Sequence, residues 1–209
     1  MNRTLSALVV SAVALPAGAL AQSSQPTKPK PASSSAAAQS QGAQMPQMPK
    51  PGPEHDVLRK DVGTWDATVE MTAPDGQKTT SKGTETVSMI GFWQVSSFKG
   101  QMMGEPFQGL GSVTFDPTKK KYVGTWIDSM TPGYSTMEAD LSADGRTMTG
   151  TMEGPDMSGK MVKSREVTEW RPDGTRVFSM YGPGDTAGKQ APMMTITYRK
   201  RGGAGGSAR

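Results

Sequence analysis

The residues that could do chemistry in this sequence are few and scattered. His55 is the only histidine, and the chain contains no cysteine. A lone histidine could act as a general base or a single metal ligand, but zinc sites built from several histidines or from thiolates are excluded. Because His55 lies in a short helical lead-in, a second interpretation is that it seals one end of the fold. No nucleophile elbow, phosphate-binding loop or string of metal ligands occurs, so we predict no catalytic residues, no metal site and no cofactor.

A second candidate is the stretch from Trp126 to Met130, which runs into Thr131-Pro132-Gly133. It ends a predicted strand beside a Pro-Gly loop, which is where a barrel opens. Asp128 could line this opening, where it could also serve as a base. The alternative is that Asp128 caps the turn and Trp126 fills the core. The sequence leaves these two interpretations open.

Methionine is unusually frequent, with 16 in all and 13 of them between Met71 and Met194. Unbranched, polarisable side chains line adaptable apolar cavities well. Thioethers also select soft metals such as Cu(I). Metal-scavenging segments usually repeat methionine closely, however, and only Met45–Met48 and Met102–Met103 do so here. The pattern therefore favours core packing.

The segments that must position these residues alternate between polar and apolar side chains. From Gly63 to Thr72, one face carries Trp and Val and the other carries Thr and Glu. A period of two indicates a half-buried strand. Similar segments follow at regular spacing, separated by Asp-Gly and Pro-Asp turns, after a helical piece over 53–60. We expect about nine or ten strands in an all-β, antiparallel, up-and-down barrel, because closure removes unpaired edges. One predicted connection is a loop over 101–107.

The N-terminal region is not part of this domain. Residues 1–21 have a positive charge at Arg3, an apolar run and a small-residue site ending at Ala21, which is typical of a secretory signal peptide. We expect cleavage after Ala21 and a periplasmic or secreted protein without a transmembrane segment. Residues 22–52 are rich in Pro, Ser, Ala and Gln and are predicted to be a disordered linker. The barrel is predicted over 53–200, followed by a flexible Gly/Arg tail over 201–209.

The calculated pI of about 9.3 does not indicate nucleic-acid binding. All 19 acidic residues lie between Glu54 and Asp185, whereas basic residues also occupy both ends of the chain. The predicted domain is therefore slightly acidic. It lacks the basic face with stacking aromatics that nucleic-acid binding requires.

Several motifs resemble known families. Gly63-Thr64-Trp65 after a short helix is similar to the lipocalin and wider calycin barrels, and the resemblance implies that Arg199 on the last strand packs over Trp65 and closes the barrel. Gly109-Leu110-Gly111, Tyr122–Met130 and Thr197-Tyr198-Arg199 are similar to the mostly bacterial family of domain of unknown function 1579. That resemblance covers roughly 53–200 and implies a fold without an activity.

The leading functional hypothesis is a barrel that binds a small lipophilic or amphiphilic molecule. Alternation predicts the following ligand-binding residues: Trp93, Trp126, Asp128, Met130, Met137, Met152 and Tyr198. One alternative is an isomerase or hydrolase at the barrel mouth with His55 or Asp128 as base. Another is a filled barrel used for protein contacts, which predicts no cavity of ligand size, about 300 Å³ or more.

Overall fold

The computed structural model describes residues 48–73, 75–185 and 190–202. The export signal predicted over 1–21 lies outside these residues, as do most of the linker predicted over 22–52 and most of the tail predicted over 201–209. No helix in the described residues is long and apolar enough to cross a membrane.

One short helical segment precedes ten antiparallel strands. The segment consists of a 3-10 helix, η1 (Pro53–His55), and a single turn of α-helix, α1 (Asp56–Arg59). The strands are β1 (Gly63–Thr72), β2 (Lys78–Ile90), β3 (Trp93–Met102), β4 (Glu105–Asp116), β5 (Lys121–Asp128), β6 (Ser135–Leu141), β7 (Thr147–Pro155), β8 (Met161–Trp170), β9 (Arg176–Met180) and β10 (Met194–Lys200). The predicted barrel of about nine or ten strands with a short N-terminal helix is confirmed.

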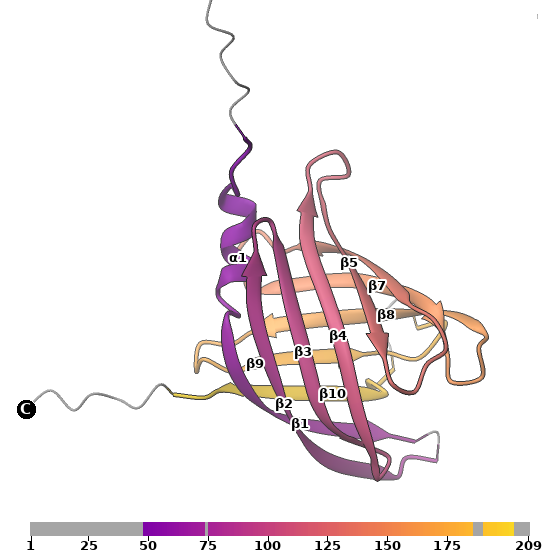
Figure 1. The fold of residues 1–209 in the computed structure, drawn as a ribbon. Helices are drawn as coiled ribbons and strands as arrows, with labels where there is room; N and C mark the ends of the chain where they lie inside the picture. Colours follow the sequence, from indigo (N-terminus) through magenta and orange to yellow (C-terminus); the bar gives the residue numbers. More distant parts are fainter. Residues whose placement is uncertain (1–47, 74, 186–189, 203–209) are drawn as a thin grey trace, which may run out of the picture. The chain divides into compact units, whose positions relative to one another are not determined.

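The strands form a closed barrel in which each pairs with its neighbour in sequence. Closure comes from β1, which pairs with β2 on one side and with β10 on the other (Figure 1). In the β1–β10 register, Ala67 lies opposite Tyr198 and Met71 lies opposite Met194. Residues opposite one another in such a pair point to the same face. Ala67 and Tyr198 are buried, and Met71 and Met194 have the same parity on their strands, so both pairs face the interior. No strand of the barrel is left as a free edge.

The connection between β3 and β4 differs from the predicted loop over 101–107. The two strands continue almost to each other and are joined by Met103 and Gly104, whose φ angles are 53° and 87°. A two-residue turn with positive φ at both positions suits the twist of a hairpin. Methionine seldom adopts this conformation, which is why the sequence did not indicate a tight turn here.

The helical segment covers one end of the barrel. Val57 and Leu58 of α1 pack in a buried cluster with Tyr122, Ala139 and Met148. The Tyr122 hydroxyl donates a hydrogen bond of 2.8 Å to the carbonyl of Glu54, which fastens η1 to β5. We call this end, from α1 to the first residues of β1, the closed end. A second cluster runs along β1 to β4 and β10 toward the opposite end.

Candidate functional site

The barrel contains a cavity of about 530 Å³ at the end opposite α1. It lies where β1, β3 and β5 finish, and Met71, Met102 and Asp128 from those strands line it. Ligand sites in proteins usually measure about 300–1,000 Å³. The cavity contradicts the filled-barrel alternative, which predicted none of this size. We call this part of the barrel the open half.

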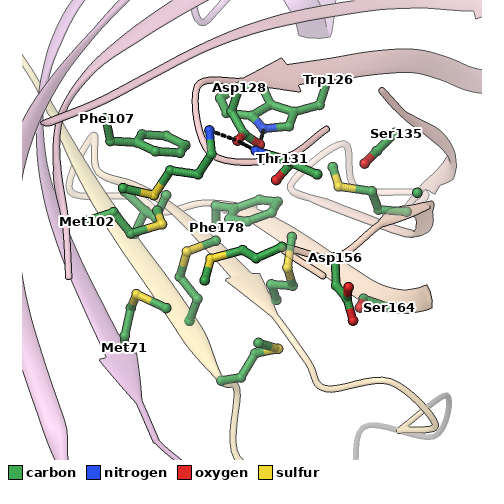
Figure 2. Close-up of a pocket in the computed structure, with 18 of the residues that line it drawn as sticks. Met71, Met102, Phe107, Trp126, Asp128, Thr131, Ser135, Asp156, Ser164 and Phe178 are labelled. Carbon is green, nitrogen blue, oxygen red and sulfur yellow. Dashed lines mark hydrogen bonds between the residues drawn. The ribbon is translucent and has the colours of Figure 1, made fainter. Parts of the chain in front are cut away.

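Methionine side chains dominate the wall of the cavity. Figure 2 shows their sulfur atoms gathered around the same space as Phe107, Phe178 and Trp126. The lining methionines are Met71, Met102, Met130, Met152, Met157, Met180, Met193 and Met194. Unbranched thioether chains have three rotatable bonds and adapt to irregular apolar shapes. The wall can therefore fit apolar molecules that differ in outline.

The aromatic rings lie flat against the wall because glycines on the adjacent strands make room for them. A Cβ atom added at Gly109 would lie 2.1 Å from Cζ2 of Trp126, and one at Gly83 would lie 2.3 Å from Cζ of Phe98. Phe107 stacks on Trp126 with ring centroids 6.4 Å apart. Any larger residue at Gly109 would push the indole toward the cavity.

Asp128 lies at the rim of the cavity and holds the neighbouring residues in place through hydrogen bonds. Its Oδ2 accepts a hydrogen bond of 3.0 Å from Nε1 of Trp126, and its Oδ1 accepts bonds of 2.8 Å from the backbone N–H groups of Met130 and Thr131 (Figure 2). The side chain thus lines the opening and also caps the turn, so the two sequence interpretations are compatible. With both oxygens engaged, Asp128 is poorly placed to act as a base.

Five of the seven predicted ligand-binding residues line the cavity: Trp126, Asp128, Met130, Met152 and Tyr198. The other two do not. Trp93 is 42% exposed, because Gln94 and Phe98 face inward on β3 and Trp93 has the opposite parity. Met137 faces inward but packs in the cluster beneath α1. The ligand-binding role of all seven residues stays a prediction.

Glu85 lines the cavity and contacts a buried arginine that does not line it. Arg176 of β9 contacts Asp61 through Nη1 at 2.8 Å and donates from Nη2 to Glu85, and all three side chains are buried. Burial alone lowers the pKa of Arg176, but the two carboxylates outweigh it and the pKa is raised. Burial also raises the pKa of Glu85, against the opposing effect of Arg176. The guanidinium group of Arg176 therefore forms ion pairs with both acids.

The arginine over Trp65 is Arg176, which corrects the expectation that Arg199 fills this place. The Arg176 Cζ lies 5.0 Å from the Trp65 ring centroid and 4.1 Å from that of Tyr198. Arg199 is exposed, because Tyr198 faces inward and the next residue on a strand faces outward. The closing arginine thus comes from β9, one strand away from the predicted position.

Residues 50–200 match the model of a family described as protein of unknown function, DUF1579. The chain belongs to this family. No curated protein matches the chain by sequence. The family resemblance predicted from the motifs is thereby confirmed, and the lipocalin-like barrel is consistent with the structure of this DUF1579 domain.

His55 lies at the closed end of the DUF1579 barrel, away from the cavity lining. It is buried in η1, and its ring packs edge-on against Phe92 with centroids 5.4 Å apart. Neither ring nitrogen has a hydrogen-bond partner among the described atoms. This placement fits a residue that seals the end of the barrel. Among the described residues, no cluster of three His, Asp or Glu side chains could hold a metal ion.

Glu166 of β8 is an interior carboxyl group that was not predicted. Its side chain is 5% exposed, and burial raises its pKa to about 7. It lies two residues from Ser164, which lines the cavity, and opposite Met180, which also does. The sequence did contain a sign that Glu166 faces the interior. In an alternating segment, it lies on the same strand face as Trp170. An acidic residue on the apolar face of a strand is expected to be buried.

Proposed function

We propose that this DUF1579 barrel binds a small lipophilic or amphiphilic molecule in its cavity. The observation that supports the proposal is the cavity of about 530 Å³, walled by methionine and aromatic side chains and floored by buried polar groups. Apolar burial would supply most of the affinity, at about 25 cal/mol per Å² removed from water. The few polar groups at the rim and floor would set the ligand's orientation.

We also propose that the protein acts outside the cytoplasm. The features that support this are the signal-peptide pattern over 1–21 and the linker composition over 22–52. Fractionation of the native host followed by N-terminal sequencing tests it. A periplasmic or secreted form that begins at Gln22 is expected, and a cytoplasmic form that retains residues 1–21 would contradict it.

Ligand retention tests the main proposal. The protein is purified from its native host, and native mass spectrometry is run before and after mild denaturation. We expect a bound small molecule that leaves on unfolding. The purified protein should also bind N-phenyl-naphthylamine, an uncharged fluorescent probe.

A matched pair of variants locates the binding site. Met152→Trp adds bulk inside the cavity, whereas Met161→Trp makes the same change on the outer face of β8, where the side chain is 59% exposed. Met152→Trp should reduce probe affinity about tenfold or more, because a ring that fills the cavity removes the ligand's apolar contacts. Met161→Trp should bind like the wild type. Equal binding by both variants, or no binding by the wild type, would reject the cavity as the site.

A further inference from the structure

Glu166 lies just below the cavity and points into the barrel. On β8, Val162 and Ser164 line the cavity, and Glu166 continues the same face toward the closed end. With a rise of about 3.4 Å per residue, its Cα lies about 7 Å deeper than that of Ser164. The carboxyl group can thus be reached only from inside the barrel.

No side chain in the described part of the chain pairs with this carboxyl group. None of the hydrogen bonds or ion pairs formed there involves Glu166, and desolvation alone accounts for its raised pKa of about 7. The Ser164 hydroxyl, which is also buried, likewise makes no hydrogen bond to a described residue. Buried polar groups are normally satisfied. Two unpartnered groups on one strand face, directly beside a cavity, therefore suggest that their partner is a ligand.

The neighbouring strands bring no compensating charge. β7 presents Gly150 and Met152 to the interior beside Glu166, and β9 presents Met180 opposite it. Arg176 is four residues further along β9, or about 13 Å by strand rise, and it already holds Asp61 and Glu85. Other ionisable side chains that line the cavity, face the interior or seal its closed end include Tyr122, Asp128, Asp156, Tyr198 and His55. The described interior thus contains several carboxyl groups but only one buried arginine.

The excess of carboxyl groups over cations in the described interior favours amphiphilic ligands with a positively charged head group. An anionic head group, such as a fatty-acid carboxylate, would meet no uncommitted cation in the described interior. A primary ammonium group could donate to the Glu166 carboxylate and to the Ser164 hydroxyl, and charge-assisted hydrogen bonds are stronger than neutral ones. The methionine wall would then hold its apolar chain.

We propose that Glu166 receives the ammonium head group of an alkylamine-type ligand, with Ser164 as a second acceptor. This inference rests on the proposed function, because it names the ligand class of the same cavity. Binding should be linked to pH. Glu166 must be ionised to pair with an ammonium group, whereas the amine stays protonated well above neutral pH. Affinity should therefore rise as the pH increases through about 7.

Displacement of N-phenyl-naphthylamine by three probes of equal chain length tests the proposal: decylamine, decanol and decanoate. At pH 8, the wild type should bind decylamine about tenfold more tightly than decanol and bind decanoate most weakly. Between pH 8 and pH 5.5 its affinity for decylamine should fall about thirtyfold, as follows from the pKa of about 7. Affinity for decanol should stay constant.

Two variants assign the effect to the residue. Glu166→Gln keeps the shape of the side chain and removes its charge, so it should lose the preference for decylamine and its pH dependence while keeping affinity for decanol. Glu153→Gln removes an exposed carboxylate on the adjacent strand β7, and it should behave like the wild type. Circular dichroism confirms that both variants are folded.

The outcomes separate the two proposals. If decanol and the fluorescent probe bind but decylamine shows no advantage, the ligand class is wrong and the cavity function stands. If the preference for decylamine persists in Glu166→Gln, the head group binds elsewhere and the role of Glu166 is rejected. If neither the fluorescent probe nor any decyl compound binds, the proposed function fails and this inference fails with it.

Discussion

The buried polar groups around Asp61 at the closed end and those beside the cavity differ in whether they have partners. At the closed end, Asp61 contacts Arg176 at 2.8 Å, accepts a bond of 2.7 Å from Nε1 of Trp170, and its backbone carbonyl accepts one of 2.7 Å from Nε1 of Trp65. In the open half, Ser164 and Glu166 have no such partners among the described residues. The network around Asp61 is therefore fully paired, with His55 as the unpaired exception at that end, whereas the two polar groups beside the cavity are unpaired among the described residues.

The apolar side chains of the closed end and of the cavity wall differ in how tightly they pack. The closed end buries Leu58, which is 2% exposed, among other well-packed side chains. The cavity is lined by methionines, whose flexible chains define a core less strictly than branched ones do. The paired network and packed side chains at the closed end supply stability, whereas the adaptable wall of the open half leaves room for a ligand. Three substitutions test this division of roles.

The largest effect is expected from Arg176→Met at the closed end. The change leaves Asp61 and Glu85 buried without their cation, and breaking a buried ion pair by removing one partner costs about 3–5 kcal/mol. Urea unfolding followed by tryptophan fluorescence measures the loss in the free energy of unfolding.

Arg199→Met is the matched control, because Arg199 is exposed on the adjacent strand β10. Surface substitutions usually change stability by less than about 0.5 kcal/mol. If the two variants lost equal stability, or if Arg199→Met lost more, the assignment of the closing arginine to Arg176 would be wrong.

The arginine predicted to cover Trp65 was Arg199, and the structure has Arg176 there. This difference shows which features the sequence alone could not predict. Alternation and turn residues were sufficient for the barrel, because a period of two and Asp-Gly turns are local signals. Which arginine covers Trp65 depends on how strands pack around a closed end, and that is set by three-dimensional contacts. The family pattern suggested the last strand, and the structure uses the one before it.

The candidate site was predictable in part for the same reason. Trp126, Met152 and Tyr198 could be placed inside by parity, but parity does not say how deep a residue lies. Met137 has the right parity and sits below the cavity, in the packed cluster. Glu166 was missed because an acid on an alternating strand is ordinarily assigned to solvent. Only the burial of its neighbours shows that it faces the interior.

The second prediction concerns the stability of the ligand-free protein in the open half. The pKa of Glu166 is raised from 4.5 to about 7 in the folded state, so the folded state holds its proton more tightly than the unfolded state does. Stability from this group is fully present below pH 4.5 and is lost as the pH rises to about 7. The total loss is about 3 kcal/mol, from 1.36 kcal/mol per pKa unit.

Glu166→Gln removes that loss, since an amide does not titrate. The difference in the free energy of unfolding, variant minus wild type, should rise by about 3 kcal/mol between pH 4.5 and pH 8. Urea titrations at several pH values measure it, and Glu153→Gln on the outer face of β7 provides the control for loss of one carboxylate. A difference that does not change with pH would show that Glu166 is solvated or paired.

The smallest effect is expected where the wall of the cavity meets an aromatic ring. In Gly109→Ala the new methyl group would lie 2.1 Å from Cζ2 of Trp126, so the indole must move off the wall. Overpacking of this kind costs about 1–3 kcal/mol. Because Trp126 lines the cavity, we expect the displaced ring to enter it, so affinity for N-phenyl-naphthylamine should fall together with stability.

Gly182→Ala provides the comparison, because a Cβ atom at Gly182 meets nothing within 4 Å. It should change stability by less than about 1 kcal/mol and leave binding intact. The informative measurement is the pair of changes in Gly109→Ala. Lost stability with unchanged binding would mean that the indole moves without entering the ligand's space. Lost binding with nearly unchanged stability would mean that the methionine wall accepts the displaced ring at little cost, contrary to the predicted loss of stability.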